Sequence, residues 1–208
     1  MVMNMNYNEL KKELNDTMLV IVSKKRTIEQ IKYYYDLGHR HFGENKAQEL
    51  LTKVNIANDI KWHFIGHLQT NKVKMILPYI YSIDSVDSIH LLKEIDKQAK
   101  ILNKNINILI QLNIAKEDTK HGLLEEEIAD FMKQTKDYPN VCVKGFMCMG
   151  PHVEDEEKIL EVFNKAHQIF LDYQQEYHLD TLSMGMSDDY KLALIASSTQ
   201  VRLGSIMF

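Results

Sequence analysis

Lys24 and Lys25 stand directly after a short apolar run, MLVIVS (18–23). A run of this kind, without polar alternation, is typical of a strand that is covered on both faces. A lysine at a strand end is usually a solvated charge. A lysine whose stem leaves a protein interior is instead partly desolvated, which lowers its pKa and makes the neutral amine available as a nucleophile. Because alternate strand residues face opposite sides, Lys24 shares a face with Val22 and Lys25 with Ser23. The spacing does not choose between the two lysines.

Two small residues near the other end of the chain are suited to binding an anion. Ser187, in MGMSDD (184–189), is expected to open a helix, and Gly204 follows Arg202 at the end of another apolar run. Helix N-termini and exposed backbone N–H groups bind phosphate, and a glycine lets a phosphate oxygen approach the backbone. The alternative is that Ser187 is only a helix cap and Gly204 only a turn residue. On these residues alone both interpretations remain open.

Histidines are a weaker signal. HRHFGE contains His39, His41 and Glu44, and WHFIGH contains His63 and His67. Neither spacing is a recognised metal-binding pattern on a strand. We therefore expect these histidines to be structural or solvated, and we expect no metal site from these motifs.

Short apolar runs alternate with segments of helical period along the whole chain. The runs predict strands at 18–23, 41–43, 62–66, 79–84, 106–113, 141–149, 181–186 and 200–204, with a helix between each strand and the next. Such alternation implies parallel strands with right-handed crossovers, and eight units favour a closed (β/α)₈ TIM barrel over an open sheet. No helix follows the last run, so NYNELKKEL (6–14) is expected to cover that gap. No linker or low-complexity segment interrupts the pattern, which predicts a single domain over 1–208.

A barrel of this class places its chemistry at the C-terminal ends of its strands. The two lysines follow the first predicted strand, and Ser187 and Gly204 follow the seventh and eighth, where barrels often bind phosphate. An amine in a phosphate-binding barrel favours a Schiff base, either with a sugar-phosphate carbonyl or with pyridoxal phosphate. Met147 ends the sixth predicted strand, where its thioether could contact a flat ring.

The composition excludes several function classes. The chain is 45% hydrophobic and 26% charged, which is ordinary for a soluble globular protein. A formal net charge of -4 gives no basic excess for nucleic acid or an anionic membrane. No apolar run approaches a membrane span or forms the apolar centre of a secretion signal. The cysteines, Cys142 and Cys148, cannot form a disulfide framework and suit a reducing cytosol, so we expect a cytoplasmic location.

Six motifs resemble those of the pyridoxal phosphate homeostasis protein family. They are VSK (22–24), FGEN-xx-QE (42–49), WHFIGHLQTNKVK (62–74), YSIDS (81–85), LSMGMSDD (182–189) and STQVRLG (198–204). Their order and spacing match the family over nearly the whole chain. WHFIGHLQTNK and LSMGMSDD are long enough to make chance similarity implausible.

The resemblance implies a barrel like the N-terminal domain of alanine racemases, with pyridoxal 5'-phosphate (PLP) held as an internal aldimine on Lys24. The PLP phosphate would lie at Ser187 and at the backbone of Gly204 and Ser205, and Arg202 would face the pyridine nitrogen. The expected partners are PLP and, transiently, PLP-dependent apo-enzymes, and the chain is expected to be a monomer without nucleic-acid or membrane partners. The cofactor-binding residues that we expect are Lys24, Asn45, Met147, Ser187, Arg202, Gly204 and Ser205.

Two arguments bear on whether such a site performs catalysis. An arginine at the pyridine nitrogen disfavours its protonation, which makes the ring a weaker electron sink. Racemisation also needs a base on each face of the substrate carbon. In the resembling racemases a tyrosine from another subunit supplies the second base, and a C-terminal β-domain brings the subunits together. We do not expect such a domain here. We therefore expect a PLP holder in vitamin B6 homeostasis, with no catalytic residue and no robust turnover. The alternatives are a weak PLP-dependent amino-acid racemase, with Tyr190 or another mouth residue as second base, and a cofactor-free Schiff-base sugar-phosphate enzyme.

Overall fold

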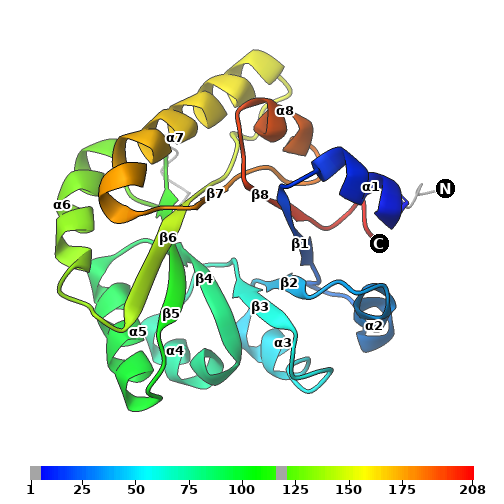
Figure 1. Ribbon diagram of the computed structural model, residues 1–208, viewed down its shortest axis with the longest axis horizontal. Coiled ribbons are helices and arrows are strands. Elements are labelled where there is room, and N and C mark those ends of the chain that lie inside the picture. The colour runs from blue at the N-terminus through cyan, green and yellow to red at the C-terminus, as the bar shows by residue number, and fades with distance from the viewer. Residues whose placement is uncertain (1–5, 116–120) are drawn as a thin grey trace.

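A closed barrel of parallel strands forms the centre of the protein (Figure 1). The structure is a computed structural model and describes residues 6–115 and 121–208. The strands follow one another around the barrel in chain order, and the last pairs with the first. The prediction of a (β/α)₈ barrel is confirmed. The strands are β1 (Met18–Val22), β2 (His41–Glu44), β3 (Lys61–Phe64), β4 (Ile80–Val86), β5 (Ile106–Leu112), β6 (Val141–Cys148), β7 (Thr181–Ser183) and β8 (Gln200–Leu203).

Helices cover the outside of the barrel, and each predicted helical segment contains one. Within the described part of the chain, none of them is long and apolar enough to cross a membrane. A short 3₁₀ helix, η1 (Leu77–Tyr79), precedes β4. The α-helices are α1 (Tyr7–Leu14), α2 (Ile28–Asp36), α3 (Ala47–Leu51), α4 (Thr70–Ile76), α5 (Ile89–Ile101), α6 (Glu125–Thr135), α7 (Glu156–Tyr177) and α8 (Tyr190–Ile195).

The strand register divides the side chains between an inner lumen and an outer core. Val20 of β1 pairs with Arg202 of β8, and Val22 pairs with Gly43 of β2, so these residues share one face of the sheet. Ile21, on the opposite face, belongs to the apolar core between the strands and the helices. That core also holds the largest fully buried side chains, among them Trp62, Phe42, Phe64, Phe146 and Phe163.

The first helix fills the gap in the ring of helices, as predicted. Figure 1 shows α1 between α8 and α2. Leu10 of α1 is fully buried, and Glu13 accepts a hydrogen bond of 3.1 Å from the Tyr190 hydroxyl of α8. On the other side, the ring of Tyr7 packs on Tyr34 of α2, with 5.7 Å between ring centroids. Apolar burial and one polar contact thus join the N-terminal helix to both neighbours.

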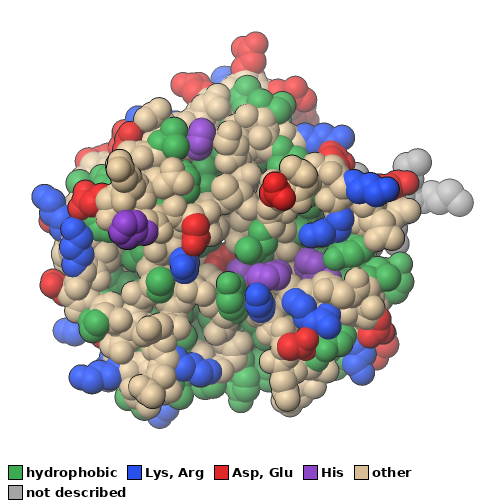
Figure 2. All heavy atoms as spheres, in the orientation of Figure 1, with side chains coloured by type: hydrophobic (Ala, Val, Ile, Leu, Met, Phe, Trp, Pro, Cys, Tyr) green, Lys and Arg blue, Asp and Glu red, His purple; other side chains and the backbone are tan. Residues whose placement is uncertain are grey.

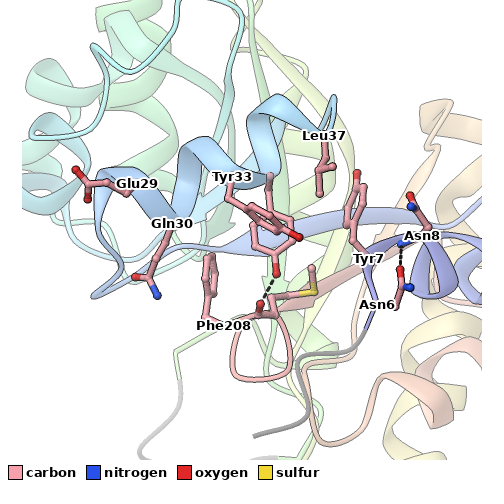
Figure 3. Close-up of a pocket in the computed structure, with 10 residues that line it drawn as sticks. Asn6, Tyr7, Asn8, Glu29, Gln30, Tyr33, Leu37 and Phe208 are labelled. Atoms are coloured by element: carbon pink, nitrogen blue, oxygen red, sulfur yellow. Dashed lines mark hydrogen bonds between the residues drawn. The ribbon is translucent and has the colours of Figure 1, made fainter.

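A hollow between α1 and α2 receives the last residues of the described chain (Figure 3). The hydroxyl of Tyr34 donates a hydrogen bond to the Met207 carbonyl, and the ring of Phe208 lies edge-on to Tyr34 at 5.3 Å. The Arg26 guanidinium lies 4.8 Å from the centroid of the Phe208 ring. Because Arg26 belongs to the turn after β1, these contacts hold the segment after β8 beside the turn that carries Lys24.

Ser187 does not open a helix, contrary to our expectation. Helix α8 begins at Tyr190 with Asp189 at its N-cap, and Ser187 lies in the preceding turn. The Asp189 carboxylate accepts a 2.6 Å hydrogen bond from the Met186 N–H, which keeps the chain in a turn for three more residues. Gly185 enables this turn, because its φ is +95° and an added Cβ would lie 2.6 Å from the Ala193 Cβ.

Burial of His39 predicts a loss of stability in acid. Its Nδ1 lies 3.1 Å from the Tyr7 hydroxyl and its Nε2 lies 2.7 Å from the His41 carbonyl, which suits a neutral ring that carries its proton on Nε2. Burial lowers the pKa of His39 from 6.5 to about 4. The unfolded chain therefore binds this proton more tightly than the folded chain does. The stability that neutral His39 contributes is fully present above pH 6.5, the pKa of His39 in the unfolded chain. It is lost as the pH falls from 6.5 towards about 4, the pKa of His39 in the folded chain.

We expect His39 to account for a decrease of roughly 2–3 kcal/mol in the free energy of unfolding between pH 7 and 4.5. Urea denaturation at a series of pH values measures this decrease. His39→Gln can keep both hydrogen bonds but cannot titrate, so its stability should depend less on pH by that amount. An unchanged pH dependence in His39→Gln would show that the proton is bound elsewhere.

Candidate functional site

Arg202 provides a fixed positive charge inside the barrel lumen. It is buried, its Nη1 donates to the Ser183 hydroxyl at 2.6 Å, and its Nη2 donates to the Cys148 carbonyl at 3.0 Å. Burial lowers the pKa of Arg202, and the nearby Asp84 carboxylate opposes that effect. Since a guanidinium is not deprotonated in proteins, the side chain stays charged. Strands β6 and β7 therefore hold this cation of β8 in one position.

Asp84 supplies the opposite charge in the lumen. Its carboxylate accepts from the Ser82 hydroxyl at 2.5 Å and from the Gln200 amide at 2.9 Å, and it lies 3.3 Å from His63 Nδ1. Burial by itself would raise the pKa of Asp84, but His63 and these hydrogen bonds outweigh it and hold the pKa below 3.8. The Gln200 amide also donates to the Ser183 hydroxyl at 2.9 Å. A continuous hydrogen-bonded network thus connects the two buried charges.

The network continues to the histidines of β2 and β3. His41 Nδ1 lies 2.9 Å from His63 Nε2, and burial, followed by the effect of His63, lowers the pKa of His41 to about 3. Figure 2 shows histidine side chains gathered near the middle of the face that it draws, over β2 and β3. The hydrogen-bond partners of His39, His41 and His63 are thus neighbouring groups of the protein itself.

Lys24 lies in the turn after β1, and its side chain is exposed. Of the two alternatives for this lysine, the structure has the solvated one, because β1 ends at Val22 and Lys24 lies in the turn beyond the sheet. Lys25 is also exposed, with a left-handed backbone at φ 60°. Of three other lysines that follow predicted strands, Lys46 is exposed and Lys72 is half-buried, while Lys120 lies outside the described residues.

A buried ion cluster lies behind the end of β1. The Nζ of Lys53 lies 2.7 Å from each of three acceptors, which are the Ser23 carbonyl, Glu44 Oε1 and Glu49 Oε1. The side chains of Lys53 and Glu44 are 5% and 0% exposed, and the Ser23 hydroxyl donates to Glu44 Oε1 at 2.6 Å. Burial raises the pKa of Glu44, although Lys53 and Ser23 oppose that effect. The cluster therefore depends on the one ammonium group that its two carboxylates share.

This cluster also fixes the backbone on both sides of Lys24. The Ser23 carbonyl accepts from Lys53, and the Lys25 N–H donates to the Glu49 carboxylate. Two side chains from the segment after β2 thus anchor the residues that flank the exposed lysine. Such support positions a functional group without touching its ligand.

The residues predicted to bind phosphate come together at the ends of β7 and β8. The Gly204 N–H donates to the Ser187 hydroxyl at 3.1 Å. In the register of β8 with β1, Leu203 pairs with Ile21, so Gly204 lies beside the end of β1. Ser205 follows in an exposed turn. Hydroxyl and backbone N–H groups at this position are suitable donors for an anion.

The other two predicted residues lie at the same end of the barrel. Met147 is buried and pairs with Ser183 in the register of β6 with β7, which places it on the lumen face beside Arg202. Asn45 follows β2 and is half-buried. Its backbone packs tightly on Gly66, where an added Cβ would lie 2.4 Å from the Asn45 carbonyl oxygen. All seven predicted cofactor residues therefore occupy the C-terminal side of the barrel.

The sequence analysis did not identify Lys53 or Asp84 as part of the site. Lys53 follows Glu49 by four residues, a spacing that allows a helical ion pair. Asp84 is the one acid of a strand that is buried at nearly every position, and such a residue must find buried partners. Both signals were present, but neither specifies the partners that the barrel supplies.

Residues 2–208 match the family described as the alanine racemase N-terminal domain. The pyridoxal phosphate homeostasis protein of Helicobacter pylori is 38% identical over 194 residues, which cover 91% of this chain and 86% of the relative. The protein of the same name from Aquifex aeolicus is 37% identical over 198 residues, which cover 93% and 87%. This chain belongs to the pyridoxal phosphate homeostasis protein family. The resemblance seen in the motifs is thereby confirmed.

Solved structures of this family and of more distant proteins share the fold. PipY of Synechococcus elongatus, solved with PLP bound, matches with a TM-score of 0.89 and 29% identity, over 97% of both chains. An alanine racemase of Clostridium difficile matches with a TM-score of 0.83, and this chain covers 56% of it. At 13% identity the racemase shows a common barrel and nothing about activity.

Proposed function

We propose that this chain binds PLP through a covalent link to Lys24 and serves in PLP homeostasis without robust catalysis. The observation that carries the proposal is the arrangement at one end of the barrel. An accessible amine follows β1, hydrogen-bond donors for an anion follow β7 and β8, and a fixed cation lies in the lumen between them. The relatives, which are named pyridoxal phosphate homeostasis proteins, and the PLP-bound PipY structure support the same ligand.

The residues present fit this cofactor, which supplies an aldehyde and an electron-withdrawing ring when it is bound. In the proposal, the Lys24 amine would condense with the aldehyde and release water, while the Ser187 hydroxyl and the backbone N–H groups of Gly204 and Ser205 would hold the phosphate. Arg202 would face the pyridine nitrogen and disfavour its protonation, because two positive groups would then oppose each other. Asn45 and Met147 would complete the lining around the ring.

The position of Tyr190 does not support a role as the second base of a racemase. Its side chain is buried against α1, where its hydroxyl donates to Glu13, so it does not face the barrel mouth as we had considered. Burial, followed by the hydrogen bond to Glu13, raises the pKa of Tyr190 to about 12. A phenol in this position cannot take a proton from a substrate in the mouth. This observation favours a holder over a racemase.

Transfer of PLP separates a holder from an enzyme. Full-length protein loaded with PLP is mixed with a PLP-dependent apo-enzyme, and recovery of that enzyme's activity is followed against an equal amount of free PLP. In parallel, amino acids are incubated with the loaded protein in deuterated water. We expect transfer and no α-hydrogen exchange. Exchange at a catalytic rate would instead establish a racemase-type enzyme, and no transfer would remove the delivery role.

Ser187→Ala is expected to weaken the binding of PLP but not of pyridoxal, which lacks the phosphate. A hydrogen bond to a charged group contributes about 1.5–3 kcal/mol, so the Kd for PLP should rise at least roughly tenfold. Fluorescence or absorbance titrations with both ligands measure this difference. Ser205→Ala is the matched control, since only the backbone N–H of Ser205 is assigned to the phosphate. An equal loss for PLP and pyridoxal would place the phosphate elsewhere.

The proposal also covers location and assembly. We propose a single domain over 1–208 that acts as a monomer in the cytosol and contacts apo-enzymes transiently. No disulfide joins Cys142 and Cys148, both of which lie in the described part of the chain, and this suits a reducing compartment. Sedimentation of the PLP-loaded protein tests the proposed assembly.

A further inference from the structure

Three side chains converge at the rim of the barrel, away from the residues assigned to PLP. His67 follows β3, Asp87 follows β4 and His121 follows β5, so neighbouring strand ends supply them. The Asp87 Oδ2 lies 3.4 Å from His67 Nδ1 and 3.7 Å from His121 Nδ1. The two imidazole rings stack with 3.8 Å between centroids and 11° between planes. Two ring nitrogens and one carboxylate oxygen thus lie within 4.8 Å of one another.

These separations suit a shared metal ion. Two ligand atoms that each lie about 2.1 Å from a tetrahedral Zn²⁺ are about 3.4 Å apart. The nitrogen–oxygen distances of 3.4 and 3.7 Å are close to this value, and all three atoms lie within 4.8 Å of one another. Shared ligation requires one imidazole to rotate out of the stack, so that both nitrogen lone pairs face the ion, and the side chains have room for this because His67 and His121 are 44% and 56% exposed.

The backbone around the cluster is anchored. The Ser85 hydroxyl donates to the Gly66 carbonyl at 2.6 Å, next to His67, and the Gln111 amide donates to the His121 carbonyl at 2.8 Å. Asp87 is only 12% exposed. Over residues 6–115 and 121–208, no lysine or arginine lies within ion-pair distance of this carboxylate. Its charge therefore faces the two histidines.

We propose that His67, Asp87 and His121 form a binding site for a divalent transition-metal ion of the zinc class. Two imidazoles and one carboxylate are ligands that suit Zn²⁺, Ni²⁺ and Co²⁺, whereas Mg²⁺ and Ca²⁺ prefer sites made only of oxygen atoms. Three protein ligands leave a coordination position for water. The motif spacing of His63 and His67 did not indicate this site, because the partners of His67 come from other strands.

The site lies at the same end of the barrel as the proposed cofactor residues but over a different group of strands. Its ligands follow β3, β4 and β5, whereas Lys24, Ser187 and Gly204 follow β1, β7 and β8. The loop that carries His67 begins at Gly66, which packs on Asn45. The metal site is therefore separate from the PLP phosphate site and adjoins the cofactor region at Asn45.

Titration of the full-length protein with Zn²⁺ in competition with a chromogenic chelator tests the proposal. We expect one ion per chain in the unsubstituted protein. His67→Asn and Asp87→Asn should each weaken binding at least about tenfold, since loss of an outer-shell partner alone costs about 10–100-fold. Co²⁺ should give a visible absorption band that the same substitutions remove. The matched control is His178→Asn, because His178 is exposed, lies outside the cluster and has a left-handed backbone that asparagine tolerates.

Two results would overturn the site. One is Zn²⁺ binding by the unsubstituted protein that is no tighter than binding by His67→Asn and Asp87→Asn. The other is an equal loss in His178→Asn, which would show binding by scattered surface histidines. Thermal unfolding of each variant confirms that the chain is folded during the titration.

Discussion

Lys53→Met is expected to lower the free energy of unfolding by about 3–5 kcal/mol. The ammonium group of Lys53 is the shared partner of Glu44 and Glu49, and the two side chains deepest in the cluster are almost fully buried. Methionine fills a similar volume but leaves the carboxylates facing each other without a cation. Burial already raises the pKa of Glu44 with Lys53 present. Without Lys53, Glu44 must take up a proton or draw water into the cluster.

Urea denaturation of the full-length protein measures this loss. Lys46→Met is the control, because Lys46 is exposed and a surface change of this kind stays within about 0.5 kcal/mol. Glu44→Gln in the Lys53→Met background should recover part of the stability by removing the unpaired charge. Covalent uptake of PLP should also become slower, since the Ser23 carbonyl next to Lys24 loses its donor. A stability equal to that of Lys46→Met would mean that the cluster contributes little.

Lys24→Ala is expected to abolish covalent binding of PLP. Lys24 and Lys25 are neighbours and both are exposed, so accessibility does not separate them. Their positions along the strand do separate the two lysines. The inner face of β1 carries Val20 and Val22, and the same alternation continues to Lys24. The left-handed turn at Lys25 breaks that alternation. Lys25→Ala should therefore bind PLP almost as the unsubstituted protein does.

The visible absorbance of PLP-loaded protein after removal of free cofactor distinguishes these variants. Lys24→Arg keeps the positive charge but cannot form the bond, so it should behave as Lys24→Ala does. Phosphate contacts would persist in both variants and leave weak, reversible binding. Covalent loading of Lys24→Arg at the normal level would contradict the assignment.

The strands could be predicted from the sequence because both of their faces are covered. INILIQLN (106–113), for example, is apolar at five of its eight positions without strict alternation, and β5 (Ile106–Leu112) lies within that run. Helix ends were less predictable, since they depend on single side chains. The Asp189 carboxylate delays α8 until Tyr190, and periodicity does not contain that information.

The site was predictable where a motif lies at the end of a strand. Their positions after the seventh and eighth strands predicted that Ser187 and Gly204 lie close together. The hydrogen bond between them confirms this proximity. Lys53 could not be recognised in this way, because its burial depends on Ser23, which is 30 residues earlier in the chain. The sequence left the exposure of Lys24 open, since it depends on where the sheet ends.

The central claim is that Lys24 carries the cofactor, and borohydride reduction followed by peptide mass spectrometry tests it most directly. PLP-loaded full-length protein is reduced, digested and mapped for the pyridoxyl group. We predict a single major adduct, on Lys24. A major adduct on Lys25 or on another lysine, with Lys24 unmodified, would contradict the account.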